Sequence, residues 1–411
     1  MLTAAEIAIR TVQEDEVKRF LEAVETAFGE AVHEEDVERW KPHLDLERQF
    51  WAWDGDAPVG TAGAYEKRIR IPGGELAAAG VTMVGVHPSH RRRGILTQLM
   101  RRQLDDAHER GEPLAVLWAS EAGIYGRYGY GMATTAARVE ADRDRTRLRA
   151  PDEPAGSTRL VGEATAKALF PPIYDRVQAA TAGMLDRTPA WWTSFRLADP
   201  EHWRHGAGPL FRAVWELEGE PEGYAMYRMR GSWDDGVPGG KLQVREVMGT
   251  SPQAIREIFR FLFGVDLVQR VEFWILTPDH PLFLSVMEPR RLKMSLGDGL
   301  WVRLLDLEAA LAARSYAADG EVTFAVQDSF CEWNDGTWTV SVESGQATVT
   351  RADGAADLAL DVADLGSTYL GGFSFAQLRG ALRVEELAVG AVERADALFR
   401  TAAQPWCPEV F

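Results

Sequence analysis

Three consecutive arginines and a glycine join a predicted strand to a predicted helix. The segment HRRRGILT (residues 90–97) follows the apolar run GVTMVGV and precedes QLMRRQLDDAHERG, which has helical periodicity. The first N–H groups of a helix lie at the positive end of its dipole, and guanidinium groups beside them add hydrogen-bond donors. Gly94 lets the main chain approach a ligand that a Cβ would obstruct. The residues from Arg91 to Gly94 therefore predict a site for a pyrophosphate.

The elements around this loop follow a mixed α/β pattern. Apolar residues at helical spacing predict a helix that ends at Gly29, and Asp54–Gly55 and Pro72–Gly74 are typical of turns between antiparallel strands. The predicted order is a strand in EIAIRTV, a helix from Val17 to Phe28, an antiparallel meander over residues 48–88, a helix from Ile95 to Arg110 and a strand in PLAVLWAS.

A polar, proline-containing stretch, ADRDRTRLRAPDEPAGS (residues 141–157), predicts a domain boundary. The next segment repeats a strand, strand, helix, strand order in GYAMYRMRG, KLQVREVMG, SPQAIREIFRFLFG and RVEFWILTP, but its strand-to-helix joint lacks arginines and a glycine pair.

A third segment begins near LWVRLLDLEAALAARSY, which we interpret as an amphipathic helix. Short strands follow, through ADLALDVADLGSTYLGG, and then the helices FAQLRGAL and AVERADALFRTA. We expect three domains, at residues 1–150, 151–300 and 301–411, because 411 residues exceed one ordinary core.

The composition of the chain limits the classes of molecule that we expect it to bind. The chain has 62 acidic and 45 basic residues and a formal net charge of −17. Such a surplus repels a phosphate backbone, so we expect no nucleic-acid partner and favour cationic molecules or lysine-bearing chains.

The N-terminus does not resemble a signal peptide and no long apolar run occurs, which favours a cytoplasmic protein without membrane spans. Two isolated cysteines and eight histidines without ligand spacing predict no disulfide framework and no metal site.

Three stretches together resemble the enhanced intracellular survival (Eis) acetyltransferases, a branch of the GCN5-related N-acetyltransferase (GNAT) superfamily. They are RRRGIL, which matches R/Q-x-x-G-x-G/A except at Leu96, then WASEAGIYGRYGYG, and the C-terminal EVF. The resemblance spans the whole chain. It implies an α/β protein with an active N-terminal GNAT domain, a degenerate second GNAT domain and a sterol-carrier-protein-like α+β domain, consistent with the missing arginines of the second segment.

The resemblance also implies catalytic roles. The family's general acid is the first tyrosine of its IYGRFGYG motif, which corresponds to Tyr125; a core tyrosine at a strand end is the alternative. The family's general base is the C-terminal carboxylate, here that of Phe411. An α-carboxylate is ionised at neutral pH, since its reference pKa is about 3.3 to 3.7. Where the family commonly has Glu before the terminal Phe, this chain has Val410, with Glu409 one place earlier.

By the same resemblance, acetyl-CoA contacts are expected at Val84, Gly85 and Val86 along the strand, at Arg91, Arg92, Arg93, Gly94, Ile95, Leu96 and Thr97 around the pyrophosphate, and at Ser120 and Glu121 near the thioester. The amine channel is expected at Phe28, Glu30, Trp40 and Met83. Phe28 could equally be a core residue at the end of an apolar helical stripe. His87 and His90 are interpreted as polar loop residues, with a lesser possibility of proton transfer.

Two hypotheses follow. The first is an acetyl-CoA-dependent N-acetyltransferase that acts on primary amines, either aminoglycoside-like polyamines or lysine side chains. The second is an acyl-CoA or lipid-binding protein with a vestigial acetyltransferase site. The resemblance further implies a homohexamer.

Overall fold

The computed structural model describes residues 7–149 and 155–411. Contacts divide the chain into two compact units. Unit 1 comprises the chain through Thr134, residues 300–402 and residues 410–411, and unit 2 comprises residues 135–299 and 403–409. The predicted boundaries near residues 150 and 300 remain predictions.

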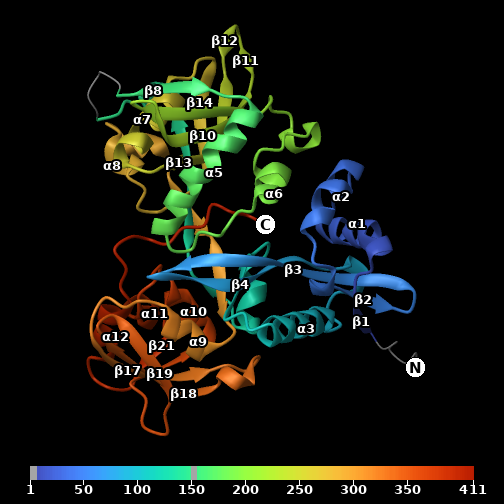
Figure 1. The fold of residues 1–411 in the computed structure, drawn as a ribbon, viewed down its shortest axis with the longest axis vertical. Helices are drawn as coiled ribbons and strands as arrows, with labels where there is room; N and C mark the ends of the chain where they lie inside the picture. The colour runs from blue at the N-terminus through green and yellow to red at the C-terminus, as the bar shows by residue number, and fades with distance from the viewer. Residues whose placement is uncertain (1–6, 150–154) are drawn as a thin grey trace. The chain divides into compact units, whose positions relative to one another are not determined.

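Unit 1 contains a seven-stranded sheet in which β4 and β5 are parallel and all other neighbours are antiparallel. The long hairpin of β3 and β4 is plain in Figure 1. The strands lie in the spatial order β1 (Ala8–Thr11), β2 (Gln49–Asp54), β3 (Ala57–Ile71), β4 (Gly74–Val86), β5 (Leu114–Trp118), β16 (Leu300–Leu304) and β6 (Gly131–Met132).

Helices α1 (Val17–Phe28) and α3 (Ile95–Glu109) cover opposite faces of this sheet. Alternate residues of β2 face opposite sides, as a strand requires. Trp51 and Trp53 pack with α1, whereas Phe50 and Ala52 pack with α3. The prediction that α1 ends at Gly29 is confirmed, since Gly29 has a φ of 79° and its N–H bonds to the last turn.

The C-terminal module belongs to unit 1 and has its own five-stranded sheet. Its strands, in spatial order, are β19 (Gln346–Arg351), β18 (Gly336–Glu343), β17 (Gly320–Gln327), β20 (Leu358–Asp361) and β21 (Val384–Glu386), and its helices are α9 (Leu307–Ala313), α10 (Val362–Tyr369), α11 (Phe375–Gly380) and α12 (Ala391–Phe399). In its interior the rings of Phe324 and Phe375 stack, and the Phe399 ring meets both edge to face.

Two sequence-based predictions in this region are wrong. Residues 300–304 form strand β16, not the start of a helix, because they pair with β5 and β6 within the sheet. Residues 362–369 form helix α10, not a strand. All residues of α10 are buried, so the helix lacks the polar face that would have marked it, and Asp361 caps it at the Ala363 N–H.

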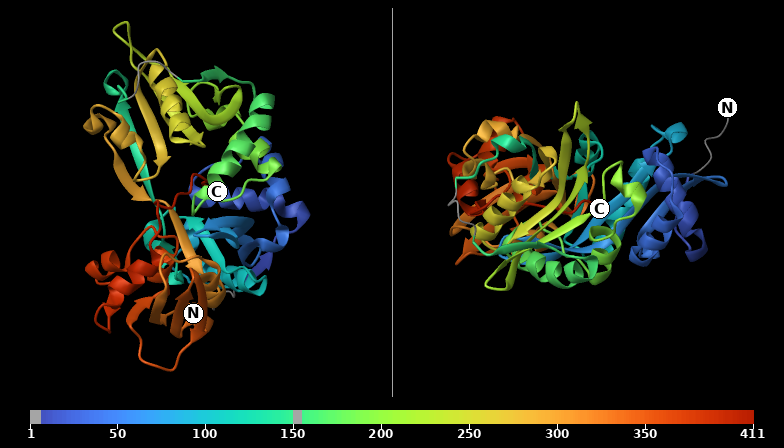
Figure 2. Two further views of the ribbon diagram at one scale, coloured as in Figure 1. Left: turned by 60° about the vertical axis from the view of Figure 1, so that its left-hand side comes forward. Right: turned by 90° about the horizontal axis from the view of Figure 1, so that it is seen from above.

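Unit 2 contains the second seven-stranded sheet, and the views of Figure 2 show its helices. Alternate residues of β10 face α5 and α7 on opposite sides of the sheet. Its strands, in spatial order, are β15 (Ser295–Asp298), β7 (Thr135–Asp142), β14 (Val268–Leu276), β13 (Gly240–Gly249), β10 (Glu220–Arg230), β9 (Phe211–Leu217) and β8 (Ser157–Leu160). Its helices are α5 (Glu163–Ala180), α6 (Pro189–Trp191), α7 (Pro252–Gly264) and α8 (Leu282–Ser285), and β11 (Trp233–Asp234) and β12 (Val237–Pro238) form a separate hairpin.

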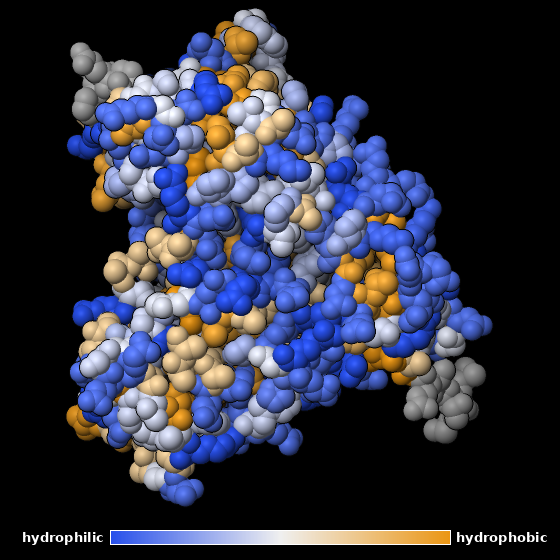
Figure 3. Space-filling model, viewed as in Figure 1, coloured by the Kyte–Doolittle hydropathy of each residue, from blue (hydrophilic) through white to orange (hydrophobic). Residues whose placement is uncertain are grey.

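The face drawn in Figure 3 is largely hydrophilic, with apolar side chains confined to patches. This distribution agrees with a chain of which 26% is charged. Within residues 7–149 and 155–411, no helix has both the length and the apolar character needed to cross a bilayer.

Candidate active site

The parallel strands β4 and β5 separate near the middle of β4. They pair only from Ala78 to Gly80 on β4 and from Leu114 to Val116 on β5, although β4 continues to Val86. Beyond Gly80, the β4 backbone that faces β5 is therefore available to a ligand. The predicted acetyl-CoA contacts Val84, Gly85 and Val86 all lie on this separated part, and both valines also pack against the core beneath α3.

A β-bulge at Met83 shapes the separated part of β4. The register with β3 shifts by one residue between Thr61 and Gly63, and Met83 has a φ of 54°, which is rare for a residue other than glycine. The Thr61 hydroxyl holds the bulge, since its Oγ1 donates to the Met83 carbonyl oxygen at 2.8 Å. Strained backbone of this kind persists only where surrounding contacts fix it, and it is common at functional sites.

The arginine loop ends in a helix N-terminus that is open to solvent. Arg92 and Gly94 have left-handed φ values of 64° and 78°, and α3 starts at Ile95. A Cβ placed on Gly94 would have no atom within 4 Å, so the space beside the first turn is free. The loop fits a pyrophosphate, because exposed guanidinium groups and the first N–H groups of α3 face the same solvent.

The corresponding strand-to-helix joint in unit 2, between β13 and α7, has a side-chain cap at its helix N-terminus. Ser251 caps α7 by accepting the Ala254 N–H at 3.1 Å, and Pro252 occupies the first helical position. The Ser251 hydroxyl also lies 3.3 Å from a Glu222 carboxylate oxygen, which disfavours a phosphate there.

Arg93 turns toward Asp54 within this loop. Its Nη1 and the His90 Nε2 lie 3.3 Å and 3.2 Å from the same Asp54 oxygen. The Ser89 hydroxyl bridges His90 and His87, with 2.7 Å to each Nδ1. The two histidines therefore stiffen the arginine loop through hydrogen bonds.

Tyr125 is buried, with 5% of its surface exposed, at the end of α4 (Ala122–Tyr125). Its ring meets that of Tyr130 edge to face at 6.0 Å. Burial raises the pKa of Tyr125, and a hydrogen bond with the Ser120 side chain opposes this to a smaller degree. The phenol is thus protonated at neutral pH, as a proton donor must be. Ser120 and Glu121 are exposed immediately before α4.

Two further residues connect the arginine loop with the Tyr125 segment. The Thr97 hydroxyl lies 3.3 Å from the Tyr128 hydroxyl. Leu96, which departs from the superfamily motif, packs against the cluster that contains Tyr125 and Tyr128. The structure therefore brings the predicted pyrophosphate loop, the predicted thioester residues and Tyr125 into one region of unit 1.

The aromatic ring of Phe411 lies against β4. A Cβ placed on Gly80 would be 3.3 Å from Phe411 Cε2 and 2.9 Å from Lys67 Cγ. Gly80 is the last residue of β4 that pairs with β5, so the C-terminal residue lies where the two strands separate. Gly80 was not among the residues predicted from the sequence, although a glycine within a strand often marks a close approach of another group.

Glu409 does not contribute negative charge to the predicted amine channel, because buried arginine side chains bind its carboxylate within unit 2. Its carboxylate accepts hydrogen bonds from Arg187 Nε and, at 2.9 Å, from Trp191 Nε1. Arg187 also binds Glu246 through two N–H groups, at 3.0 Å and 2.6 Å. Burial raises the pKa of Glu409, but Arg187 and Arg196 outweigh burial and lower it.

Negative charge gathers instead at the C-terminal end of α1. Burial, and then the charges of Glu30 and Asp36, raise the pKa of Glu25 to about 6. Glu30 was predicted from the sequence but Glu25 was not, although Glu25 lies one turn before the predicted channel residue Phe28. An ammonium group near these carboxylates would relieve their mutual repulsion.

The other predicted channel residues lie on α1 or pack against its cluster. Phe28 is 50% exposed, so it is not a core residue. Trp40 and Met83 are half-buried and pack on the cluster of α1 with Trp51 and Trp53.

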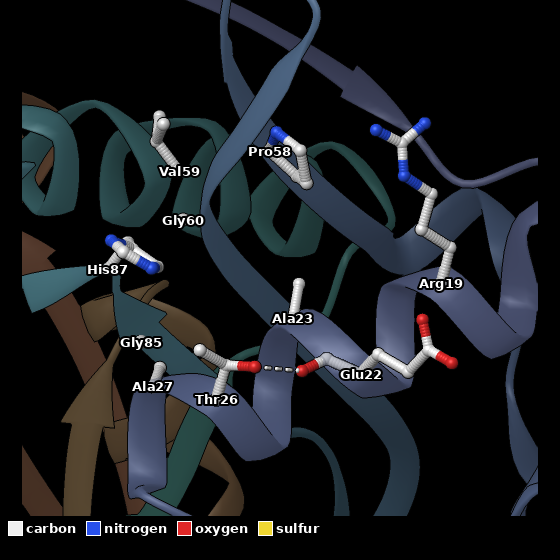
Figure 4. Close-up of a pocket in the computed structure, with 10 residues that line it drawn as sticks. All are labelled: Arg19, Glu22, Ala23, Thr26, Ala27, Pro58, Val59, Gly60, Gly85 and His87. Carbon is white, nitrogen blue, oxygen red and sulfur yellow. Dashed lines mark hydrogen bonds between the residues drawn. The ribbon is translucent and has the colours of Figure 1, made fainter.

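A cavity of 290 Å³ lies between α1 and the ends of β3 and β4 (Figure 4). Of the predicted ligand contacts, only Gly85 belongs to its lining. The sheet approaches α1 closely here, because a Cβ on Gly85 would be 2.6 Å from Ala27 Cβ. The lining residues are Arg19, Glu22, Ala23, Thr26, Ala27, Pro58, Val59, Gly60, Gly85 and His87.

Family models match three parts of the chain. Residues 8–133 and 183–304 each match an acetyltransferase (GNAT) domain, and residues 307–408 match a sterol carrier protein domain. The predicted architecture of two GNAT domains and a sterol-carrier-protein-like domain is therefore confirmed. The GNAT fold implies acetyl-CoA as the cosubstrate.

Relatives span nearly the whole chain. An uncharacterized N-acetyltransferase of Streptomyces avermitilis is 40% identical over 98% of this chain and 99% of its own. The N-acetyltransferase Eis of Mycobacterium tuberculosis is 32% identical over 91% of this chain and 92% of its own. The crystal structure of Eis1 from Mycobacterium abscessus superposes with a TM-score of 0.84 at 34% identity, covering 98% of this chain and 100% of that one. A GCN5-related N-acetyltransferase from Anabaena variabilis has the same fold, with a TM-score of 0.85 at 21% identity over 99% of this chain and 100% of its own. This chain is an N-acetyltransferase and belongs to the Eis family of the GNAT superfamily.

Proposed function

We propose that this enzyme transfers the acetyl group of acetyl-CoA to primary amines of cationic molecules. Aminoglycoside-like polyamines are the first substrate class, and lysine side chains of peptides are the variant. The observation that carries the proposal is the position of the Phe411 ring against Gly80, where β4 and β5 separate. This position is next to the separated part of β4, whose residues 84–86 we assign to acetyl-CoA.

The proposed mechanism uses two groups of the chain. Acetyl-CoA supplies an activated acetyl thioester when it is bound. The Phe411 carboxylate accepts a proton from the attacking amine, directly or through water, and the Tyr125 phenol donates a proton to the departing sulfur. A carboxylate and a phenol with a raised pKa are both in the required protonation state at neutral pH.

The proposed amine pocket combines charge with aromatic surface. Glu25, Glu30 and Asp36 attract a polyamine, and exposed Phe28 and half-buried Trp40 offer apolar and aromatic contacts to its carbon skeleton. Arg91, Arg92 and Gly94 are proposed to bind the pyrophosphate. Arg93 is bound to Asp54 and contributes charge from there.

A thiol-release assay tests the proposal. We expect acetyl-CoA-dependent release with polyamines or aminoglycosides, and a weaker signal with lysine peptides. Extending the chain by three residues beyond Phe411 is expected to abolish turnover, because it replaces the carboxylate by an amide, while acetyl-CoA binding measured by calorimetry persists. Full turnover of the extended chain would overturn the role of the terminal carboxylate.

The lipid-binding hypothesis receives less support. The interior of the C-terminal module is occupied by packed aromatic rings and by the fully buried Arg314, whose guanidinium lies 4.3 Å from the centre of the Phe399 ring. Calorimetric titration of fatty acids into the intact enzyme tests this hypothesis.

We also propose, from the family resemblance, that the enzyme forms a homohexamer. Light scattering measures the oligomeric state, and a monomer would contradict this proposal.

A further inference from the structure

Arg303 is a fully buried charge in a strand of the acetyltransferase sheet. It lies on β16, between β5 and β6, and 0% of its surface is exposed. Its guanidinium lies directly against Gly129, since a Cβ placed on Gly129 would be 2.3 Å from Nη1 and 2.6 Å from Cζ. Gly129 also has a φ of 81°. Both its conformation and the guanidinium beside it therefore require glycine at this position.

Gly129 belongs to the turn that carries Tyr125. Its N–H donates to the Gly126 carbonyl at 2.9 Å, and the Tyr130 N–H donates to the Tyr125 carbonyl at 3.3 Å. The rings of Tyr125 and Tyr130 also touch edge to face. Residues 125–130 thus form a closed turn, and the guanidinium of Arg303 packs on it.

Asp328 of the C-terminal module orients Arg303. Its Oδ2 accepts Arg303 Nη2 at 2.6 Å and Asn334 Nδ2 at 3.2 Å. Its Oδ1 accepts the backbone N–H groups of Phe330 at 3.2 Å and of Cys331 at 2.9 Å. Four donors therefore fix this carboxylate in a single orientation.

The same loop of the C-terminal module packs on the acetyltransferase domain. Phe330 meets the Tyr128 ring edge to face at 5.0 Å, and Asn334 Nδ2 donates to the Leu304 carbonyl at 3.1 Å. The Asp328–Arg303 pair is thus part of a continuous contact between the module and the Tyr125 turn.

Stability alone does not explain a guanidinium in this strand. A buried ion pair is often no more stabilising than apolar side chains of similar volume, which suit a central strand equally well. What the pair adds is a planar group held at one place and in one orientation beneath the turn.

We infer that Arg303 is a positioning residue for acetyl transfer. It holds the Tyr125–Tyr130 turn in the geometry from which Tyr125 donates its proton, and Asp328 fixes Arg303 in turn. The inference rests on the proposed role of Tyr125. It assigns the C-terminal module a part in the acetyl-transfer site.

A double-mutant cycle tests the inference. Arg303→Met combined with Asp328→Asn removes both charges and keeps an oxygen for the N–H groups of Phe330 and Cys331. We expect kcat to fall about tenfold or more, since small displacements of a catalytic group have large effects on rate. The dissociation constant of acetyl-CoA, measured by calorimetry, should not change. In a Tyr125→Phe background the same pair of substitutions should lower kcat by less than about twofold.

The outcomes separate the inference from the proposed function. Equal loss of kcat in both backgrounds, or no loss in either, overturns the positioning role. Full turnover of Tyr125→Phe alone overturns the role of Tyr125 itself. Should the double variant not fold, Arg303→Lys serves instead, because it keeps the charge opposite Asp328 and loses the planar contact with Gly129. Its kcat should fall with an unchanged melting temperature, and wild-type kcat would contradict the inference.

Discussion

Arg187 and Glu409 form a buried ion pair in which both side chains are almost completely excluded from solvent, at 0% and 1% exposure. Glu246 and Arg196 complete a cluster of two positive and two negative groups within unit 2. Charges in such a cluster depend on one another, because each is costly to bury alone.

Glu409→Gln should therefore destabilise unit 2. It leaves Arg187 and Arg196 with one carboxylate between them, and breaking a buried pair costs about 3 to 5 kcal/mol. Calorimetry at neutral pH should show a lower melting temperature. Val410→Ala is the matched control, because the neighbouring Val410 is 47% exposed and its removal should change stability by less than about 0.5 kcal/mol. An unchanged melting temperature in Glu409→Gln would contradict the cluster's role.

The same cluster predicts acid sensitivity. Burial raises the pKa of Glu246, but Arg187 and Arg196 outweigh burial and lower it to about 2. A carboxyl whose pKa falls on folding stabilises the folded state above its unfolded pKa, and this contribution disappears as pH falls from about 4.5 toward 2. The wild-type protein should lose stability steeply over this range, and Glu409→Gln less steeply.

Gly80→Ala should lower kcat. The added methyl group would be 3.3 Å from the Phe411 ring and 2.9 Å from Lys67 Cγ, so one of them must move. A displaced terminus is expected to slow turnover about tenfold or more. The control is Gly162→Ala, where the new methyl meets no atom within 4 Å. Equal kcat in both variants would show that the position of Phe411 does not limit the reaction.

Gly94→Ala should weaken acetyl-CoA binding about tenfold, because a left-handed residue other than glycine costs roughly 1 to 2 kcal/mol. No atom lies within 4 Å of the new methyl, so backbone strain and not a clash within the protein would cause the effect. Calorimetric titration measures the affinity. Gly264→Ala adds a methyl in open space without a positive φ and should bind normally.

Tyr125→Phe should reduce kcat about 100-fold or more, the usual contribution of a general acid. In the wild type, burial raises the pKa of Tyr125, so the phenol loses its proton at a higher pH than an ordinary tyrosine does. Turnover should therefore rise with amine deprotonation and decline only at a pH above the ordinary tyrosine value. Tyr130→Phe removes a second buried phenol oxygen and should retain wild-type kcat. A loss of kcat in Tyr130→Phe equal to that in Tyr125→Phe would contradict the role of Tyr125 as the general acid.

Glu25→Gln should raise KM for polyamines and raise the melting temperature. The pKa of Glu25 is raised to about 6, first by burial and then by Glu30 and Asp36, so its ionised form is disfavoured in the folded state. Such a carboxyl lowers stability at neutral pH, and the loss is recovered as pH falls below 6. Wild-type KM should accordingly increase on acidification through pH 6. An identical pH dependence of KM in the variant would exclude Glu25 as its source.

Local patterns predicted the elements that carry the arginine loop. The apolar spacing and Gly29 defined α1, and the joint from β4 through Gly94 to α3 was visible in the residue types alone. Such features depend on contacts between residues near in sequence, which periodicity and turn chemistry report directly.

Features that depend on distant contacts could not be predicted. The residues 300–304 form a strand because β5 and β6, from far earlier in the chain, accept them as a partner. Glu25 became notable only because folding buries it and places Glu30 and Asp36 near it. The contact of Phe411 with Gly80 joins residues more than 300 positions apart, and only the tertiary structure discloses it.

The insertion of β16 between β5 and β6 bears on how the protein is made. Synthesis on the ribosome completes β5 and β6 long before residue 300 emerges, so β5 has an unpaired edge and β6 has no neighbour until then. The acetyltransferase sheet is therefore finished only after residues 135–299, the main segment of unit 2, have been synthesised. A fragment that ends near residue 150 would expose the β5 edge permanently and should aggregate, so the N-terminal domain cannot be studied as a simple truncation.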